Sequence, residues 1–389
     1  MATTWLDKLE QELNIDIDWM DPDFLVQMQP TIKFHDLTSN QNFVDIQMGH
    51  PSNVELLRET AREVRDEYDA SGADHTHPLW LAIYTRMAVR MCKKVVDLIQ
   101  GRVLLQTSPA QAYSTEATLA HARLYDAEFA RAGISRDRFC IKIPCTGPAL
   151  TAARILQQEG IQTLGTALFG VPQARAASQA RCLSISPYYN DVRAHADRSF
   201  WPVVADPALQ HPTSPRLIQI LEMYRRLADE TGQRQPLVKA ASFVSKEEAM
   251  AAGELGCHSA TLFNTLIEEL KSLPYTDADR PGGAEAARYA LPKPQSTDPA
   301  DFYKDRAPPS PRLRGLLSTD PLNAADPSTP ATSYETATAT DYLADGGKLL
   351  DAAIAEDQVT KEWLDAALTL FIACEKRSQD KVEAVLAAL

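Results

Sequence analysis

A lysine within an apolar segment is the residue best suited to chemistry in this sequence. Lys142 lies in the segment Arg138-Phe-Cys-Ile-Lys-Ile-Pro144. Side chains alternate between the two faces of an extended strand, so Lys142 shares one face with Cys140, and the Phe and Ile side chains share the other. If this strand belongs to a barrel, Lys142 points into the interior. Burial would lower its pKa and leave a neutral amine that can form a Schiff base with a ketone. A lysine that extends from a strand end into water is the competing interpretation, and the alternation alone leaves both open.

Short β-rich segments that could position this lysine alternate with longer helical patterns from about residue 14 to residue 265. Helical patterns separate the candidate strands, which predicts a parallel sheet. Eight such strands favour an α/β fold, a (β/α)8 barrel preceded by an N-terminal helix. The candidate strands are Ile15–Asp18, Ile32–Asp36, Val103–Thr107, Phe139–Pro144, Thr163–Leu168, Leu183–Pro187, Leu237–Ser242 and Ser259–Phe263.

The composition changes after Leu273 and divides the chain into three parts. Residues 1–273 form the expected barrel. Residues 274–338 are rich in Pro, Ala, Ser and Thr, and 11 of the 25 prolines fall between Pro274 and Pro330, which predicts a wrapping segment or linker. Helical periodicity returns in residues 339–389, and we expect these helices to pack either on the barrel or on a partner subunit.

The overall composition narrows the classes of function. The 389 residues are 44% hydrophobic and 23% charged, as is typical of globular proteins. The formal net charge of −13 disfavours binding to nucleic acids or to anionic membranes. No apolar segment approaches the roughly 20 residues of a membrane span, and the N-terminus lacks the pattern of a signal peptide. Together with six scattered cysteines, these features predict a cytoplasmic protein.

Common cofactor motifs are absent from the sequence. It contains no P-loop, no GxGxxG and no HExxH motif, and no CxxC pair among its cysteines. We therefore expect neither a metal ion nor an organic cofactor.

The lysine segment resembles a known family. Cys140-Ile-Lys-Ile-Pro-Cys-Thr146 is similar to the lysine strand of transaldolases and the related fructose-6-phosphate aldolases, which are Schiff-base enzymes with a (β/α)8 fold. Further segments resemble family motifs in the same order. They are His35-Asp-Leu-Thr-Ser-Asn-Gln41, Gly160-Ile-Gln-Thr-Leu-Gly-Thr-Ala-Leu-Phe169, Ile185-Ser-Pro-Tyr188 and Ala240-Ala-Ser-Phe243, with a C-terminal segment, LADGGKLLDAAIAEDQVTKE, that is similar to the family's closing helix.

The resemblance implies roles for individual residues. Lys142 would form the Schiff base with a ketose or ketone donor, and an aldehyde would be the acceptor. Asp18, in Asp18-Trp-Met-Asp21, would exchange a proton with the hydroxyl beside the scissile bond, although Asp16 and Asp21 are close alternatives. A buried carboxyl group near an amine has a tunable pKa, which suits this role.

The remaining matched positions imply contacts to substrate and water. Asn40 and Ser186 would hold hydroxyl groups of the donor, and Thr166 would help to position a catalytic water. Thr38 and Ser242 lie in the same matched segments and are further candidates for substrate binding.

Two positions resemble the aldolase branch more than the transaldolase branch. Gln106 stands where transaldolases carry Glu, and Tyr188 stands where they carry Phe. In fructose-6-phosphate aldolases, Gln, Thr and Tyr hold the water that protonates the enamine, so the resemblance implies that role for Gln106, Thr166 and Tyr188. Alternatively, Gln106 and Tyr188 are buried polar side chains that form hydrogen bonds within the protein and have no catalytic role.

The sequence departs from the family where the substrate phosphate would bind. Asp191 occupies the position of a family arginine, and Val244 occupies that of a second basic residue. Each lost charge-assisted hydrogen bond would weaken phosphate binding by ~1.5–3 kcal/mol, although Arg193 or Lys246 could substitute. We expect Asp191 to border a site for a non-phosphorylated or specialised substrate.

Three functions follow from this sequence. The first is a metal-free aldolase or transaldolase that acts through Lys142 on a dihydroxyacetone-type unit. The second is an ordinary pentose-phosphate transaldolase with a relocated phosphate site. The third is a non-catalytic barrel used for binding or assembly. A homo-oligomer is possible for each of them, and no nucleic-acid or membrane partner is expected.

Overall fold

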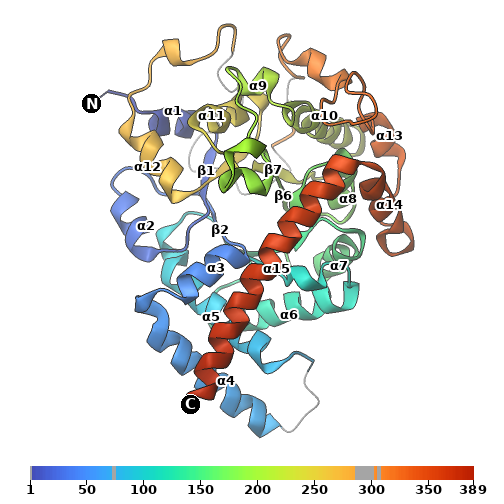
Figure 1. Ribbon diagram of the computed structural model, residues 1–389. Coiled ribbons are helices and arrows are strands. Elements are labelled where there is room, and N and C mark those ends of the chain that lie inside the picture. Colours follow the sequence, from blue (N-terminus) through green and yellow to red (C-terminus); the bar gives the residue numbers. More distant parts are fainter. Residues whose placement is uncertain (1, 72–75, 285–301, 305–307) are drawn as a thin grey trace.

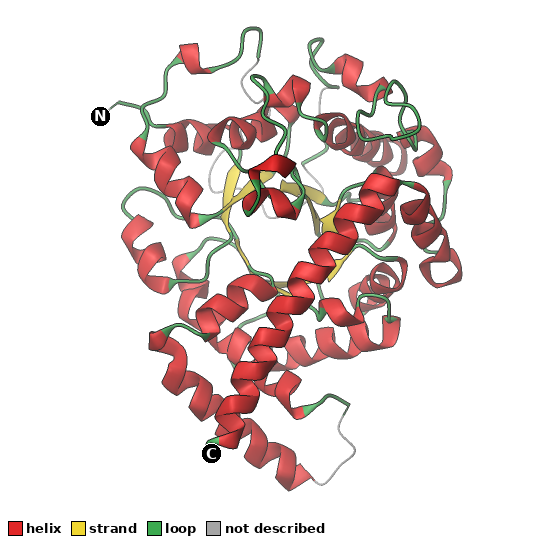
Figure 2. Cartoon of the chain, viewed as in Figure 1, coloured by secondary structure: helices red, strands yellow, loops and turns green. Residues whose placement is uncertain are grey.

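A closed barrel of parallel strands forms the centre of the protein. The computed structural model describes residues 2–71, 76–284, 302–304 and 308–389. Strands β1 to β8 pair in chain order, and β1 closes the barrel against β8 (Figures 1 and 2). The predicted (β/α)8 barrel is thus confirmed. The strands are β1 Asn14–Ile17, β2 Leu37–Thr38, β3 Val103–Gln106, β4 Phe139–Pro144, β5 Thr163–Leu168, β6 Ser184–Pro187, β7 Leu237–Ala240 and β8 Ser259–Leu262.

Helices surround the barrel, and the last of them crosses one of its ends (Figure 2). They are α1 Trp5–Glu12, α2 Pro22–Met28, α3 Gln41–Met48, α4 Val54–Ser71, α5 Leu79–Val95, α6 Thr115–Arg131, α7 Gly147–Gln158, α8 Val171–Gln179, α9 Pro207–Gln210, α10 Ser214–Thr231, α11 Lys246–Leu255, α12 Asn264–Ser272, α13 Tyr334–Ala339, α14 Lys348–Glu356 and α15 Gln358–Ala387. Among the described residues, no helix has both the length and the apolar character to cross a membrane.

The second strand differs from the sequence prediction. The expected strand Ile32–Asp36 lies outside the regular ladder, and the observed β2 has only two residues, Leu37 and Thr38. Ile32 and Phe34 are both buried in the core, which gives this segment the apolar alternation of a strand although regular pairing begins only at Leu37.

The alternation of strand β4 separates two apolar environments. Phe139, Ile141 and Ile143 belong to the main core cluster. Cys140 instead belongs to a separate small cluster with three leucines, which are Leu104, Leu164 and Leu183. Leu104 pairs with Cys140 and Gln106 pairs with Lys142 in the β3–β4 register, so Lys142 shares the inward face of this small cluster.

The described part of the Pro-rich segment lies against the outside of the barrel. Phe302 and Tyr303 are buried, and the Tyr303 hydroxyl donates a hydrogen bond of 2.7 Å to the Pro236 carbonyl. The 3₁₀ helix Arg314–Ser318 and helix α13 pack on α10. The predicted wrapping segment therefore follows the barrel surface where it is described, whereas residues 285–301 and 305–307 of this prediction lie outside the described residues.

The long helix α15 crosses the end of the barrel at which the strands terminate (Figure 1). It packs against α3, α4 and α5. Asp45 of α3 anchors it, since this carboxylate accepts hydrogen bonds from Arg377 Nε at 2.8 Å and from Ser378 Oγ at 3.2 Å. The C-terminal helix therefore lies on its own barrel, one of the two placements that the sequence left open.

A buried arginine joins this C-terminal region to the barrel. Arg216 of α10 is 3% exposed and its guanidinium contacts Asp320 at 3.0 Å and Asp357 at 2.9 Å. It also donates a hydrogen bond of 3.2 Å to the carbonyl of Phe169, just after β5. Both carboxylates belong to segments that follow the barrel in sequence, so this arginine holds the tail in place.

We predict that Arg216→Ala lowers the free energy of unfolding by about 3–5 kcal/mol, because it leaves the buried carboxylate of Asp320 and the partly buried one of Asp357 without their partner. The exposed pair Arg123–Glu159 provides the control, since Arg123→Ala should cost less than about 1 kcal/mol. Urea unfolding followed by circular dichroism measures both. Equal losses in the two variants would contradict the anchoring role of Arg216.

Candidate active site

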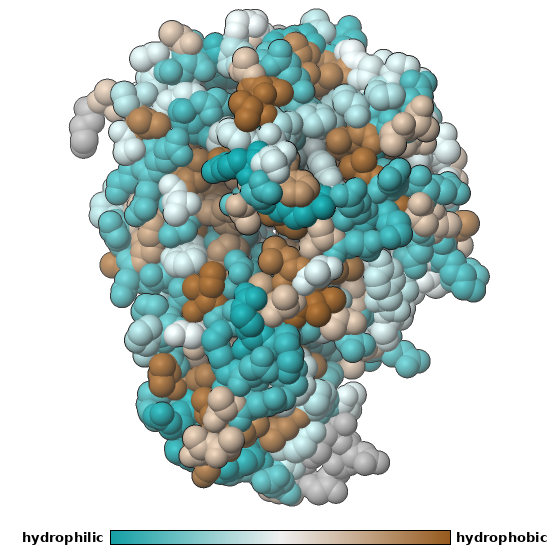
Figure 3. Space-filling view, in the orientation of Figure 1, coloured by the Kyte–Doolittle hydropathy of each residue, from teal (hydrophilic) through white to brown (hydrophobic). Residues whose placement is uncertain are grey.

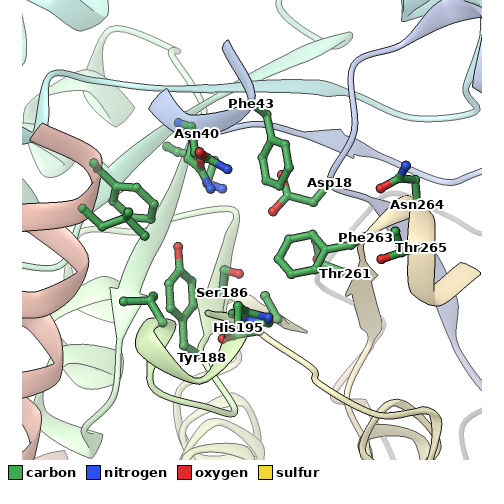
Figure 4. A pocket seen from close by; sticks show the side chains of 17 residues that line it. Asp18, Asn40, Phe43, Ser186, Tyr188, His195, Thr261, Phe263, Asn264 and Thr265 are labelled. Carbon is green, nitrogen blue, oxygen red and sulfur yellow. Dashed lines mark hydrogen bonds between the residues drawn. The ribbon is translucent and has the colours of Figure 1, made fainter. Parts of the chain in front are cut away.

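A cavity of about 260 Å³ opens at the ends of the strands, under helix α15 (Figure 4). In (β/α)8 barrels the loops that follow the strands form this end of the barrel, and the active sites of such enzymes lie there. The cavity is lined by Asp18, Asn40, Asn42, Phe43, Lys142, Ser186, Tyr188, Val192, His195, Ala241, Ser242, Thr261, Phe263, Asn264, Thr265, Leu370 and Phe371.

Lys142 reaches this cavity from β4 while almost its entire surface is buried. Its exposed fraction is 3%. Its Nζ forms no hydrogen bond or ion pair within the described part of the chain. Burial lowers its pKa, and the opposing attraction of Asp18 is too weak to offset burial. The amine is therefore easier to deprotonate than an ordinary lysine.

Asp18 is the carboxyl group whose charge acts on Lys142 in the cavity. Burial raises the pKa of Asp18 to about 7, although the attraction of Lys142 acts in the opposite direction. Its Oδ1 atom is buried without a hydrogen-bond partner among the described residues. A carboxyl group with a pKa near 7 can both accept and donate a proton at neutral pH.

The two alternative acids occupy other positions. Asp16 is buried in an ion-pair cluster and contacts Lys239 Nζ at 2.8 Å. Asp21 caps helix α2, where its side chain accepts a hydrogen bond from the Asp23 amide. Neither carboxylate lines the cavity, so Asp18 alone of the three acids is brought to Lys142.

The cluster around Asp16 has the residue types of a metal site. Ligand atoms of Asp16, His35 and Asp36 lie within 4.8 Å of one another. However, Lys239 Nζ lies 2.8 Å from Asp16 and 2.9 Å from Asp36 and already supplies a cation. Burial by itself would raise the pKa of Asp36, but Lys239 and His35 outweigh it and lower that pKa. This donor set therefore suits an ion pair and does not suit a divalent metal.

Gln106 and Thr166 stand on the strands next to Lys142. Gln106 pairs with Lys142 in the register, and both polar atoms of its side chain are buried without a partner in the described part of the protein. Thr166 pairs with Pro144 and its hydroxyl lies 3.2 Å from the hydroxyl of Tyr188. Burial raises the pKa of Tyr188, so its phenol stays protonated. A polar group with no protein partner can bond a substrate or water.

A local irregularity of β5 positions Thr166. The pairing of β5 with β6 shifts between Gly165 and Leu168, and Ala167 adopts a left-handed φ of 51°. A side chain at Gly165 would begin only 2.8 Å from the Cys145 sulfur, so this position requires glycine. Such a bulge redirects the side chains beside it.

The predicted donor contacts come from β2 and β6. Asn40 begins α3, and its side-chain oxygen accepts a hydrogen bond of 2.9 Å from the Asn42 amide, which leaves its NH₂ group for the cavity. Ser186 lines the cavity from β6, and Figure 4 shows it beside Tyr188. The Thr38 hydroxyl is buried without a partner among the described residues and lies outside the cavity lining.

Ser242 is held in a strained conformation at the cavity wall. Its φ of 66° is left-handed, which is unfavourable for a residue with a side chain. Its hydroxyl donates a hydrogen bond of 3.1 Å to the Asn190 carbonyl and lies 2.9 Å from His195 Nε2. The His195 ring remains accessible through the cavity mouth. The surrounding protein, and then the charge of Arg198, lower the pKa of His195, so the ring is neutral at pH 7.

Asp191 is a predicted site residue that the structure does not bring to the cavity. Thr38, Gln106 and Thr166 are likewise absent from the cavity lining. It caps the 3₁₀ helix Val192–His195 and forms an ion pair with Arg193, which also contacts Glu362 of α15 at 2.6 Å. Lys246 lies 2.6 Å from Glu247 and over the ring of Trp5. Lys142 is thus the sole cationic side chain in the lining formed by the described residues.

Several lining residues were missed by the sequence analysis. Phe263 directly follows β8, a position at which side chains line the mouth of a barrel, so the strand prediction contained a signal for it. His195 carried no such signal. Leu370 and Phe371 lie on α15, more than a hundred residues after the last strand, and only the packing of that helix brings them here.

The chain is similar to known proteins over much of its length. A family model described as Transaldolase/Fructose-6-phosphate aldolase matches residues 15–298. A transaldolase of Synechocystis sp. is 29% identical over 259 residues, 66% of this chain and 62% of the cyanobacterial protein. Transaldolases of Nostoc punctiforme and Gloeobacter violaceus are each 30% identical, over 68% and 72% of this chain and over 75% and 67% of their own lengths.

The two buried lysines should respond differently to removal of their charge. At pH 6, we predict that Lys239→Met lowers the free energy of unfolding by about 3–5 kcal/mol, because it removes the lysine cation between the buried carboxylates of Asp16 and Asp36. Lys142→Met should cost less than about 1 kcal/mol or stabilise the protein, since it removes a buried amine that has no ion-pair partner. Urea unfolding measures both, and a larger loss in Lys142→Met would contradict this interpretation.

Proposed function

The chain belongs to the transaldolase/fructose-6-phosphate aldolase family, and on that premise we propose that it is a Schiff-base aldolase acting through Lys142. The observation that carries this proposal is a buried lysine with a lowered pKa, placed beside a carboxyl group with a pKa near 7 in one cavity. The donor would be a ketose or ketone, and the bond made or broken would join a dihydroxyacetone-type unit to an aldehyde.

The first steps use the neutral amine of Lys142. Its nitrogen attacks the donor carbonyl, and the resulting carbinolamine loses water to form an iminium ion. This cation accepts the electron pair of the breaking C–C bond and so becomes an enamine. The NH₂ group of Asn40 and the hydroxyl of Ser186 are suited to hold donor hydroxyls beside this carbon.

Asp18 would carry the proton of the cleavage step. As a carboxylate it takes the proton from the hydroxyl on the carbon that becomes the aldehyde. As an acid it returns a proton to the alkoxide in the reverse direction. Its raised pKa supports both roles at neutral pH.

Gln106, Thr166 and Tyr188 would hold the water that completes the cycle. The Thr166 and Tyr188 hydroxyls lie 3.2 Å apart, and the Gln106 amide has no protein partner among the described residues. A water bound by these groups could protonate the enamine carbon and could also hydrolyse the iminium ion. Release of the donor by protonation would make the enzyme a lyase, whereas capture by a second aldehyde would make it a transferase.

We further propose that the substrate is not phosphorylated. A phosphate dianion needs cationic or strong hydrogen-bond donors where it is buried. Arg193 is occupied by Asp191 and Glu362, and Lys246 is occupied by Glu247. Neither lines the cavity, which favours a neutral ketone or a specialised metabolite.

Ordinary transaldolase activity is the second candidate. The relatives reported above carry the name transaldolase, which favours it. It would require a phosphate site formed by other groups, because the lining has no cation apart from Lys142 among the described residues.

Borohydride trapping tests the Schiff base. We predict that dihydroxyacetone or fructose, followed by borohydride, gives a reduced adduct on the peptide that contains Lys142, which mass spectrometry can locate. Lys142→Ala should give none, whereas Lys246→Ala should react normally because Lys246 lies outside the cavity. Adduct formation with fructose 6-phosphate alone would support ordinary transaldolase. No adduct with any donor would contradict the catalytic proposal and favour a binding role.

The pH dependence tests Asp18. Protonation removes the base needed for cleavage, so kcat/KM for cleavage should fall about tenfold per pH unit below a pKa of about 7. Asp18→Asn should lower kcat/KM by about 10²–10⁴-fold and abolish this acid limb. Asp16→Asn would disturb stability instead. An unchanged acid limb in Asp18→Asn would assign the titration to another group.

A further inference from the structure

The outer half of the cavity differs chemically from the half around Lys142. We propose that this outer half binds the apolar substituent of an acceptor aldehyde, so that the enzyme prefers alkyl or aryl aldehydes to sugar phosphates. The inference rests on the proposed aldolase function and adds the chemical class of the second substrate. The groups for donor chemistry lie on the strands or within two residues of a strand end, whereas much of the outer wall comes from helices α3 and α15 and from the segment that begins at Phe263.

Aromatic side chains form one side of the outer wall. Phe43 of α3 and Phe263 after β8 lie with ring centroids 5.5 Å apart, and Figure 4 shows both beside Asp18. The ring of Trp19 packs edge-on against Phe43 at 5.9 Å, and that of His195 packs edge-on against Phe263 at 4.9 Å. These contacts present rings to the cavity, which favours apolar groups.

Helix α15 supplies the opposite side of the wall. Phe371 is 2% exposed, whereas Leu370 is 41% exposed at the opening. Apolar side chains gather around the hollow in the middle of the face shown in Figure 3, where α15 crosses the barrel. Apolar side chains on this side of the cavity favour an apolar group of the ligand over a sugar phosphate.

The contacts of α15 hold this wall in position. Ser108, just after β3, donates a hydrogen bond of 3.0 Å to Glu375, one turn after Phe371. Arg193 holds Glu362 near the start of the helix, and Asp45 holds Arg377 near its end. Anchors therefore lie on both sides of Leu370 and Phe371, so the wall is built before a ligand arrives.

The polar groups of the outer half are uncharged. His195 is neutral at pH 7, and the other polar members include the hydroxyl and amide groups of Ser242, Asn264 and Thr265. Arg198, whose charge acts on His195, lies over the ring of Trp201 and outside the lining. A phosphate dianion would lose its hydration here without gaining a cation, whereas an apolar group would lose little.

The bond-forming step is balanced without a further reactant. The iminium ion of dihydroxyacetone first loses a carbon-bound proton to the water held by Gln106, Thr166 and Tyr188 and becomes an enamine. The enamine carbon then attacks the carbonyl carbon of the aldehyde, and the carbonyl electron pair moves to its oxygen. That oxygen takes the proton of Asp18, while the enamine nitrogen returns to an iminium ion. Water then hydrolyses the iminium ion and releases the aldol and the free amine. The substituent of the aldehyde points away from Lys142 toward the outer wall.

An acceptor series tests the inference. The full-length enzyme is given dihydroxyacetone with hexanal, phenylacetaldehyde, glyceraldehyde or glyceraldehyde 3-phosphate, and aldol formation is followed by chromatography. We expect kcat/KM for the two apolar aldehydes to exceed that for glyceraldehyde 3-phosphate by at least about tenfold. A preference for glyceraldehyde 3-phosphate, or equal values throughout, would overturn the inference while leaving the Schiff base on Lys142 intact. Absence of that adduct would overturn the aldolase function as well.

Two matched substitutions on α15 distinguish an effect on the cavity wall from a general effect on the stability of the helix. Leu370 and Ile372 have similar exposure, 41% and 40%, but only Leu370 lines the cavity. Leu370→Asn should lower kcat/KM for hexanal about three- to tenfold relative to glyceraldehyde, with unchanged trapping of dihydroxyacetone. Ile372→Asn should leave this ratio unchanged. An unchanged ratio in Leu370→Asn, or the same change in both variants, would overturn the assignment of the wall.

Discussion

The removal of Lys142 and Asp18 from water is the constraint on which the site depends. Each group is costly to bury in its charged form, so the lysine pKa falls and the carboxyl pKa rises to about 7. Their mutual attraction opposes both shifts but does not outweigh burial. Such a pair can supply a nucleophilic amine and a proton carrier at neutral pH without any other ionisable group.

The same barrel treats a second buried lysine in the opposite way. Lys239 lies between Asp16 and Asp36, and these ion pairs raise its pKa in spite of burial. Burial is therefore common to both lysines, and only the partners differ. The comparison explains why one lysine is suited to structure and the other to chemistry: Lys142 lacks the hydrogen-bonded carboxylates that would keep it protonated.

In the proposed enzyme, substrate choice would depend on a different part of the chain from the chemistry. The strands carry Lys142, Gln106 and Thr166, and the loops and the helix α15 close the cavity above them. Arg193 illustrates the link between the two. It is a cation near the mouth, but Asp191 and Glu362 bind it, so it joins α15 to the barrel and is withheld from the substrate. The C-terminal helix α15 therefore forms part of the cavity mouth, and its Glu362 pairs with the positive charge of Arg193.

Much of the fold and part of the site could be predicted from the sequence, because these features depend on local patterns. The alternation in Phe139–Pro144 predicted both the strand and the inward face of Lys142, and the strand count predicted the barrel. The position of β2 could not be predicted in this way, since Ile32 and Phe34 are buried without regular pairing.

Only the tertiary structure determined which side chains lie together in the cavity. Asp16, Asp18 and Asp21 are nearly equivalent in the sequence, and only the closed barrel separates an ion pair, a cavity carboxyl and a helix cap. Likewise, only the path of α15 brings Leu370 and Phe371 over Lys142. The physical reason is that burial, pKa and contacts between distant segments depend on all the surrounding atoms, whereas alternation and turn chemistry depend on neighbours in the chain.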